Sequence, residues 1–449
     1  MKSAVETLSP TRVKFTVEVG FDELQPTVAA AYRKVAEQVR VPGFRPGKVP
    51  PPIIDRRIGR GVVLEQALND AIPQFYGQAV DEAAVAVISQ PEIEVTNFAD
   101  GEGLTFTAEV DVRPTIELPD PESITVTVDP VTVSDADVDA ELAALADRFA
   151  TLKPVDRPAR RGDFVTIDMT VRLDGEVLED GTVTGASYEV GSAQLVEGLD
   201  EALEGLTAGQ SAEFDAPLAG PYAGRTARAE VTVRAVREKQ VPALDDAFAQ
   251  QASEFDTLEE LRAHIRERIG RTRRIQQHVQ ARERLLQTLL DSLDIPVPER
   301  IVDAEVRSRA EQLRRYAEAR GMDAEGLLAQ QGESLHDHEA HVRADVEREL
   351  RVQFLLDTVV AREQLQLQEA ELTDYLIQRA TRLGVSPDDY ANQLVRTNTV
   401  PLAVADALRG KALTYLLQRV RVVDTTGAPV NLEGGSTPAA EAEPAVSEA

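Results

Sequence analysis

The sequence predicts an α+β multidomain fold with a β-rich first half and a long helical second half. In the first half, apolar and polar residues alternate over several stretches, as they do in half-buried strands. From residue 256 onward, apolar residues instead recur three and four positions apart, as they do on one face of a helix. The chain has 449 residues, a length typical of about three domains of about 150 residues each.

Composition and charge exclude several classes of function. The chain has 77 acidic and 48 basic residues and a formal net charge of −29, so any contact with nucleic acid requires a local basic patch. It contains no cysteine, which excludes disulfides, thiolate zinc sites and cysteine nucleophiles. Aromatic residues make up only 4% of the chain, and such aliphatic, charge-rich composition favours long helices.

Residues 1–112 are expected to form a first domain with the order β-α-α-β-β. Val13, Phe15, Val17 and Val19 alternate with polar residues and predict a half-buried strand. In chain order, the expected elements are a strand at 12–19, a helix at 22–38, a Gly- and Pro-containing loop at 42–52, a helix at 64–87, and strands at 93–95 and 104–112.

Residues 113–150 are expected to form a linker followed by the first part of the helical module. Pro114, Pro119, Pro121 and Pro130 indicate an extended segment. The S-x-x-D pattern that begins at Ser134 then predicts an N-capped short helix that ends near residue 149.

Residues 151–240 are expected to form an inserted, compact antiparallel α+β domain. The stretch DFVTIDMTVRLDGEV alternates apolar and polar residues and contains a hairpin turn at Asp174-Gly175. The stretch LVEGLDEALEGLTAGQ predicts a short helix bounded by glycines, and RAEVTVRAVRE predicts a closing strand.

Residues 241–423 are expected to form an all-α module with arms, and residues 424–449 a disordered acidic tail. A capping box at Thr257 and Glu260 opens a helix that would be about 50 Å long if it continued to Leu293. Further helices are expected at 299–320, 335–368, 369–384, 387–396 and 401–421. The tail has acids, no bases, and abundant Gly, Pro, Ala and Ser, a composition typical of disorder.

The loop GFRPGKVP at residues 43–50 is the sharpest local feature. Between Arg33 and Arg60 eight bases face two acids, so this segment carries +6 in a chain of −29. An exposed Phe44 beside cations suits a target with phosphates and an apolar spot. The alternative, which charge alone favours, is a solvated basic turn with Phe44 buried in its own domain.

The loop and the order of the modules resemble the trigger factor family, the bacterial ribosome-associated chaperones. The resemblance extends over nearly the whole chain and implies that the loop docks beside the exit of the ribosomal tunnel, with Phe44, Arg45 and Lys48 contacting ribosomal protein and RNA. Pro46 stands where other members often carry a base, which is expected to weaken docking modestly. The implied ribosome-binding residues are Gly43, Phe44, Arg45, Pro46, Gly47 and Lys48.

Residues 161–236 resemble the FKBP-type peptidyl-prolyl isomerases. This chemistry needs no nucleophile, because an apolar pocket can favour the twisted amide that has lost its resonance. The resemblance implies a pocket formed by Met169, Leu178, Tyr188, Val196, Leu199 and Tyr222.

The pocket departs from the family pattern. Met169 and Leu199 stand where many members have Phe, and Ala229 stands where a further Phe is usual. Tyr188 and Tyr222 are then expected to be the only aromatic residues that line the cleft. We therefore expect weak isomerase activity, or a near-inactive domain that still holds peptides; for Met169 and Val196 a role in the core is an equal alternative.

No other catalytic or cofactor-binding motif is expected. His336, His338 and His341 would spread around a helix and are expected to be solvated rather than to bind metal. The sequence has no P-loop, Rossmann fingerprint or serine elbow, so no nucleotide or cofactor is expected. It also has no signal-like h-region and no long apolar run, which predicts a cytoplasmic protein without a membrane partner.

The leading hypothesis is an ATP-independent chaperone, partly bound to the large ribosomal subunit, that shields nascent and unfolded polypeptides and has weak isomerase activity. Many amphipathic helices with few aromatic residues would present modest apolar patches for promiscuous contact with clients. One alternative is a free prolyl isomerase or holdase whose ribosome docking is minor. Another is an export-pathway or periplasmic chaperone, which the loop at 43–50 disfavours; the sequence is compatible with self-association of the free protein.

Overall fold

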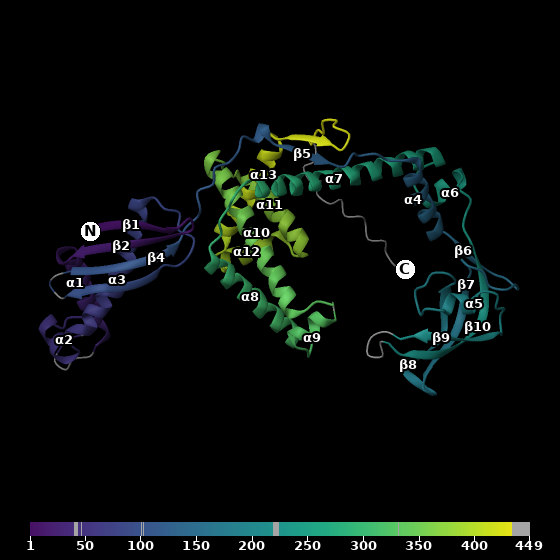
Figure 1. Cartoon of the computed structure of the whole chain (residues 1–449), viewed down its shortest axis with the longest axis horizontal. Helices are drawn as coiled ribbons and strands as arrows, with labels where there is room; N and C mark the ends of the chain where they lie inside the picture. The colour runs from purple at the N-terminus through teal and green to yellow at the C-terminus, as the bar shows by residue number, and fades with distance from the viewer. Residues whose placement is uncertain are drawn as a thin grey trace. The chain divides into compact units, whose positions relative to one another are not determined.

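A computed structural model describes residues 1–39, 44–45, 47–99, 101, 103–218, 224–330 and 332–432 (Figure 1). The chain forms two compact units. One unit comprises Met1–Asp129 and His278–Ala449, and the other comprises Pro130–Gln277. The unit boundaries fall before the short helix predicted after residue 134 and inside the long helix predicted from residue 256.

The first unit begins with a four-stranded antiparallel sheet of order β1-β2-β4-β3. Its strands are β1 (Lys2–Ser9), β2 (Arg12–Gly20), β3 (Glu92–Ala99) and β4 (Gly103–Asp111). The strands predicted at 12–19, 93–95 and 104–112 are confirmed. The predicted β-α-α-β-β order is wrong at its start because β1 was missed: this edge strand is exposed along most of its length, so it has no clear alternation.

Three helices accompany this sheet rather than the two predicted. They are α1 (Phe21–Gln38), α2 (Pro51–Arg57) and α3 (Arg60–Ala83). One face of α3 packs its small residues Ala71 and Ala79 with Phe75 against Phe15 and Phe106 of the sheet. Helix α2 lies partly in the predicted loop at 42–52; it is only seven residues long, too short to show a helical period.

The second half of the first unit is mainly helical, as predicted. Its helices are α8 (Glu299–Glu318), α9 (Ala324–Ala329), α10 (Leu335–Arg362), α11 (Glu369–Leu383), α12 (Pro387–Arg396) and α13 (Val400–Leu417), which follow α7 (Leu258–Ser292). Helix α10 stops six residues before the predicted end at 368. Gln364 adopts a positive φ of 49°, which a right-handed helix cannot accommodate.

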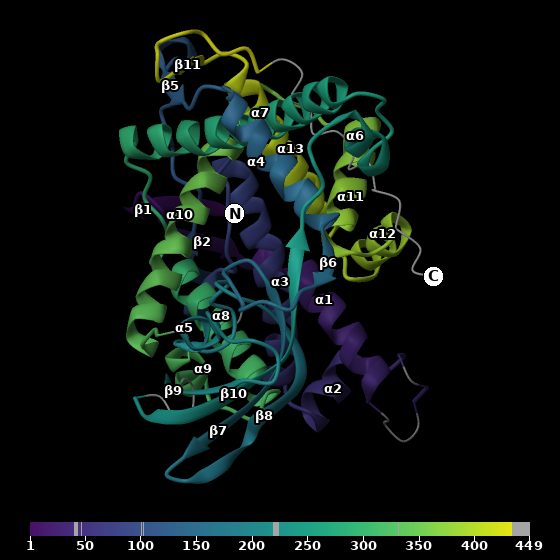
Figure 2. The same ribbon diagram turned by 90° about the vertical axis from the view of Figure 1, so that its right-hand side faces the viewer.

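The helical module is not purely α-helical, which corrects the all-α prediction for residues 241–423. Strand β5 (Thr125–Val128) pairs in parallel with β11 (Arg421–Asp424), and the two lie side by side in both views (Figure 1, Figure 2). Val126, Val128 and Val422 are buried in one core with residues of α7, α10 and α13. The segment predicted as a linker therefore contributes to this core. Residues 424–432 are described, and the rest of the predicted tail lies outside the described residues.

The second unit contains α4 (Asp135–Arg148), α6 (Asp246–Ala252) and the first part of α7. The predicted cap of α4 is confirmed: Ser134 and Asp137 form a capping box, and Phe149 is the C-cap residue. Val138 and Leu142 of α4 pack with residues of α6 and α7 in a small apolar cluster. Helix α6 was missed because its seven residues are too few to define a period.

The inserted domain of this unit is an antiparallel sheet with one short helix, as predicted. Its elements are β6 (Thr151–Pro154), β7 (Phe164–Leu173), β8 (Glu176–Glu189), α5 (Leu199–Leu203), β9 (Ser211–Pro217) and β10 (Thr226–Gln240). Strand β10 pairs with β6, β7 and β9. The predicted hairpin turn is confirmed, since Asp174 and Gly175 both have positive φ, as a type I′ turn requires.

Within the described part of the chain, none of the helices combines the length and the apolar composition needed to cross a lipid bilayer.

Candidate functional site

Three side chains of the loop after α1 are exposed: the ring of Phe44 and the basic groups of Arg45 and Lys48. Phe44 is 39% exposed, and Arg45 and Lys48 are also exposed. The alternative in which Phe44 is buried in its own domain is therefore wrong for this structure. Gly43 and Pro46, two of the predicted ribosome-binding residues, lie outside the described residues.

Backbone contacts and one apolar anchor hold the described part of this loop. The Gly47 amide donates to the Ala36 carbonyl of α1 at 2.9 Å, and the Lys48 amide donates to the Arg45 carbonyl at 3.0 Å. Gly47 has a φ of +80°, which glycine adopts without steric cost. Val49 is buried among residues of α1, α2 and α3. The exposed side chains thus project from an anchored turn.

The helices beside the loop add further exposed cations. Arg56 and Arg57 of α2 are exposed, and among the described residues neither they nor Arg45 and Lys48 have an acidic partner. Of the two acids between Arg33 and Arg60, Asp55 already accepts a hydrogen bond from the Tyr32 hydroxyl at 2.7 Å, and Glu37 of α1 lies beside Gly47. The surface therefore combines a solvent-exposed ring with uncompensated positive charge, which suits a phosphate-rich target that also offers an apolar contact.

The predicted isomerase residues that the structure describes belong to one apolar cluster. Met169, Tyr188 and Leu199 are buried, and Leu178 and Val196 are partly buried against them. Tyr222 lies outside the described residues. The strands β7 and β8, the helix α5 and the segment before α5 thus bring the five described side chains together in one cluster.

Phe214 of β9 is an aromatic residue of this cluster that the sequence analysis missed. It is partly buried against the same residues and pairs directly with Ala229 of β10, so the two side chains share one face of the sheet. Its ring lies close to Gly198, where an added Cβ would stand 3.1 Å away. An aromatic ring therefore lies next to Ala229, the position where the family pattern expects a phenylalanine. This neighbour could not be predicted from the sequence because it depends on the register of β9 against β10.

Asp200 organises the segment between β8 and α5. Its Oδ1 accepts hydrogen bonds from the Tyr188 hydroxyl and the Gly191 amide, both at 2.7 Å, and its Oδ2 accepts from the Ala193 amide at 3.1 Å. Burial raises the pKa of this carboxyl, but the donated hydrogen bonds outweigh burial and leave the pKa below its ordinary value. The carboxylate thus fixes the orientation of Tyr188, whose own pKa is raised chiefly by burial.

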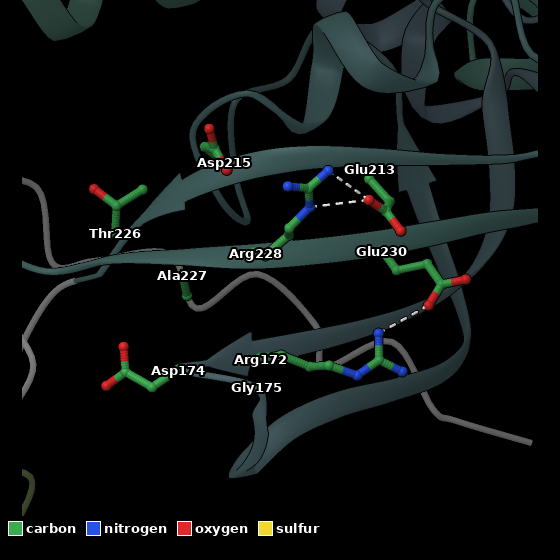
Figure 3. A pocket seen from close by; sticks show the side chains of 9 residues that line it. All are labelled: Arg172, Asp174, Gly175, Glu213, Asp215, Thr226, Ala227, Arg228 and Glu230. Atoms are coloured by element: carbon green, nitrogen blue, oxygen red, sulfur yellow. Dashed lines mark hydrogen bonds and ion pairs between the residues drawn. The ribbon is translucent and has the colours of Figure 1, made fainter.

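A shallow cavity of about 280 Å³ lies in the same domain but away from these residues (Figure 3). Arg172 pairs with Glu230, and Arg228 pairs with Glu213. Because side chains alternate along a strand, Arg172 and Arg228 lie on the face opposite Met169 and Ala229. The cavity is polar and largely charge-paired, so it does not provide the apolar surroundings that a proline ring requires. Its lining residues are Arg172, Asp174, Gly175, Glu213, Asp215, Thr226, Ala227, Arg228 and Glu230.

Two of the three clustered histidines converge on one carboxylate rather than spreading apart as predicted. Glu333, just before α10, contacts His338 Nδ1 at 3.1 Å and His341 Nδ1 at 2.8 Å. Residues three apart share one face of a helix, and Glu333 lies next to that face. The contact with Glu333 raises the pKa of His341.

The helical module exposes separate apolar side chains. Val395 is 70% exposed and Leu402 is 66% exposed, and no residue of α12 is buried. The exposed large apolar residues of α11, α12 and their flanking segments are Ile377, Leu383, Val385, Val395, Val400 and Leu402.

Three family models match the sequence. The model described as bacterial trigger factor protein matches residues 1–145, and the model of its C-terminus matches residues 257–418. The model of the FKBP-type peptidyl-prolyl cis-trans isomerases matches residues 155–236.

Curated relatives and one solved structure agree with these matches. The chain is 48% identical over 444 residues to the trigger factor of Parafrankia sp. (strain EAN1pec), covering 99% of this chain and 88% of that protein. It is 49% identical over 433 residues to the trigger factor of Frankia casuarinae, covering 96% and 90%. A solved structure from work on promiscuous substrate recognition by the trigger factor chaperone is similar in fold, with a TM-score of 0.57 at 21% identity, covering 93% of this chain and 99% of that one.

Proposed function

The chain belongs to the bacterial trigger factor family and contains an FKBP-type isomerase domain, and from this premise we propose that it docks on the large ribosomal subunit through Phe44, Arg45 and Lys48. Its function is that of a trigger factor chaperone that assists the folding of nascent chains. In our proposal the docking target is ribosomal protein and RNA beside the exit tunnel, and Gly43, Pro46 and Gly47 complete the docking loop.

The observation that carries the proposal is the exposure of Phe44 next to cations that have no acidic partner. Docking removes the apolar surface of the Phe44 ring from water, which is favourable. Arg45 and Lys48 can neutralise ribosomal RNA phosphates and release counterions. Gly47 and Val49 already hold the loop in place before docking. Docking therefore costs less conformational entropy, which favours affinity.

The remainder of the function follows from the other domains. The exposed apolar residues of α11 and α12 would contact unfolded and nascent polypeptides weakly and without ATP, in the cytoplasm. The cluster around Met169, Leu178, Tyr188, Val196 and Leu199 would form the isomerase pocket, together with Tyr222 and Phe214. With aliphatic residues at several positions, this pocket would favour the twisted amide less than an aromatic pocket does.

Co-sedimentation with ribosomes across a salt series tests the docking proposal. The wild-type protein should pellet with ribosomes at low salt and less at high salt, because counterion release drives the contact. The variant Phe44→Ala, Arg45→Ala, Lys48→Ala should lose most of this binding while still suppressing aggregation in solution. The salt dependence of any remaining binding should also fall, by about one unit of slope for each lost phosphate contact.

A matched control separates the loop from general basicity. The variant Lys2→Ala, Leu8→Ala removes one exposed cation and one 44%-exposed apolar side chain from β1 of the same domain. It should bind ribosomes better than the loop variant. Equal loss in both variants, or no sedimentation of the wild type at low salt, would contradict docking through the loop and favour a free isomerase or holdase.

A further inference from the structure

The β8–α5 loop (residues 190–198) connects residues of the proposed pocket in the FKBP-type domain. It is preceded by Tyr188, near the end of β8, and followed by Leu199, the first residue of α5. Both side chains are buried in the apolar cluster, and Val196 of the loop is partly buried against it. The path of the loop therefore sets where Val196 stands relative to Tyr188 and Leu199.

Ala193 of this loop has a backbone conformation that is costly for alanine. Its φ is 52°, in the left-handed region that a Cβ atom disfavours. Gly191 and Gly198 of the same loop also have positive φ, at 95° and 89°, but glycine adopts such values without this cost. A strained residue persists only where the surrounding structure holds it, so Ala193 requires a contact that holds it.

Asp200 of α5 provides that contact. Its Oδ2 accepts a hydrogen bond from the Ala193 amide at 3.1 Å, and its Oδ1 accepts from the Gly191 amide at 2.7 Å. Among the residues that the structure describes, no other side chain accepts a hydrogen bond from an amide of this loop. Because Oδ1 also accepts from the Tyr188 hydroxyl at 2.7 Å, one carboxylate joins the loop to both β8 and α5.

The far end of the loop is held without Asp200. Gly198 lies against the Phe214 ring, where an added Cβ would stand 3.1 Å from the ring. The Leu199 amide donates to the Val196 carbonyl at 3.2 Å, which closes a turn directly before α5. With this end fixed by its own contacts, the Asp200 carboxylate controls the course of the residues that precede Val196.

We propose that Asp200 is a positioning residue for the isomerase reaction. Through the amides of Gly191 and Ala193 it holds the β8–α5 loop in one course. Val196 and Tyr188 then keep the spacing that the twisted X–Pro amide requires, and small displacements of groups around a transition state reduce the rate strongly. Asp200 acts through the loop and through Tyr188 and does not itself contact the substrate. This role presupposes the proposed isomerase pocket and is independent of ribosome docking.

Steady-state kinetics of the full chain with a short X–Pro peptide test this role. Asp200→Asn preserves the size of the side chain but replaces one acceptor oxygen with an amide that donates. It therefore cannot accept from Tyr188, Gly191 and Ala193 together. We expect kcat to fall about tenfold, which corresponds to about 1.4 kcal/mol of lost transition-state stabilisation. KM should stay within about twofold of the wild-type value, because the apolar pocket still binds the peptide.

Substitutions at Ala193 separate positioning from general stabilisation. Ala193 is exposed, so changes there leave the apolar core intact. Ala193→Gly removes the steric cost of a positive φ. It should restore part of the kcat that Asp200→Asn loses and should change the wild-type kcat little. Ala193→Val raises that cost and should lower kcat in the otherwise wild-type chain, so this variant tests the role even if Asp200→Asn does not fold.

Asp168→Asn is the matched control. Asp168 of β7 also accepts a hydrogen bond from a backbone amide of the domain, that of Gly185 at 2.8 Å. It points away from the neighbouring Met169 because side chains alternate along a strand. Asp168→Asn should therefore leave kcat unchanged.

The proposal is overturned if Asp200→Asn leaves kcat unchanged or raises KM alone, if Asp168→Asn lowers kcat equally, or if Ala193→Gly restores none of the loss. If Asp200→Asn does not fold, an unchanged kcat in Ala193→Val overturns it. A rate that falls in Leu178→Ala but not in Asp200→Asn contradicts only the positioning role. A rate that Leu178→Ala leaves unchanged, or a wild-type chain without measurable isomerisation, contradicts the proposed pocket as well.

Discussion

Asp163 shows how a single carboxylate stabilises the FKBP-type domain. It is one of the few buried acids and accepts two hydrogen bonds from the Arg157 guanidinium, at 2.5 and 3.0 Å, and one from the Arg160 amide at 2.9 Å. Burial raises the pKa of this carboxyl, but the bonds from Arg157 and Arg160 outweigh burial, and the pKa is lowered overall. The ionised form is therefore the one that the folded domain stabilises.

We predict that Asp163→Asn destabilises the domain by about 1.5–3 kcal/mol near neutral pH, because charge-assisted hydrogen bonds are lost. A carboxyl whose folded-state pKa is depressed contributes stability above its unfolded pKa, and that contribution disappears as the pH falls through the folded pKa. The difference between wild type and Asp163→Asn should therefore shrink on acidification. Urea unfolding at several pH values measures this difference.

The exposed Glu213 provides the control. It pairs with Arg228 on the solvent-facing side of the sheet, so Glu213→Gln should change the stability by no more than about 0.5 kcal/mol. A difference between wild type and Asp163→Asn that stayed constant down to low pH would contradict the role given to the Asp163 charge.

At single positions, the sequence predicted an exposed Phe44 as one of two alternatives, but it did not predict Phe214 and Asp200 in the FKBP-type domain. The motif around Phe44 allowed an exposed or a buried ring, and the anchoring of Gly47 and Val49 to α1 decided in favour of the exposed ring. Phe214 could not be found because its place beside Ala229 depends on the register between two strands. Asp200 was missed because its hydrogen-bond donors, the Tyr188 hydroxyl of β8 and the Gly191 amide of the loop that follows, meet it only in the folded domain.

Among the elements, long periodic segments were predicted well and short or edge elements were not. Alternation predicted β2, β4 and β7, and capping signals predicted the starts of α4 and α7. The short helices α6 and α9 span less than two turns, too few for a helical period to stand out. Strands β5 and β11 are four residues each and are stabilised by pairing with each other, which local sequence does not encode.

The aliphatic side chains that β7, β8 and α5 bring together lead to a prediction about isomerase activity. Because Met169, Leu178 and Leu199 are aliphatic, the rate enhancement for a short X–Pro peptide should be at least about tenfold below that of an FKBP with an aromatic pocket, a loss of about 1.4 kcal/mol in transition-state stabilisation. Phe214→Leu should lower the remaining rate further. A coupled peptide assay measures both effects.

A neighbouring strand residue supplies the control for this assay. Val177 of β8 is 51% exposed and points away from the partly buried Leu178 because side chains alternate. Val177→Ala should leave the isomerase rate unchanged, whereas Leu178→Ala should reduce it. A rate comparable to that of an aromatic-pocket FKBP would show that the aliphatic substitutions do not weaken the site.

At the scale of the molecule, the parallel pair of β5 and β11 joins segments nearly 300 residues apart in sequence into one core. A chain that ends at Leu417 lacks β11 and exposes Val126 and Val128. The loss of burial for these two valines corresponds to about 3–6 kcal/mol, so the first unit should unfold at clearly lower denaturant concentration. Guanidinium unfolding followed by circular dichroism measures this shift.

A chain that ends at Leu432 is the control, because it retains β11 and the packing of Val430 and Leu432. It should be far closer to the full chain than to the chain that ends at Leu417. Equal unfolding midpoints for the two shortened chains would mean that β11 contributes little to the core of the first unit.

The proposed function depends on contact between Phe44 and the ribosome, and site-specific photo-crosslinking on translating ribosomes detects this contact. A photoreactive phenylalanine analogue at position 44 should crosslink to a component of the large ribosomal subunit, and the crosslink should weaken with rising salt. The same analogue at Val62, which is exposed in α3 of the same domain, should give little or no crosslink. Absence of a crosslink from position 44, or an equal yield from position 62, would contradict docking through the loop.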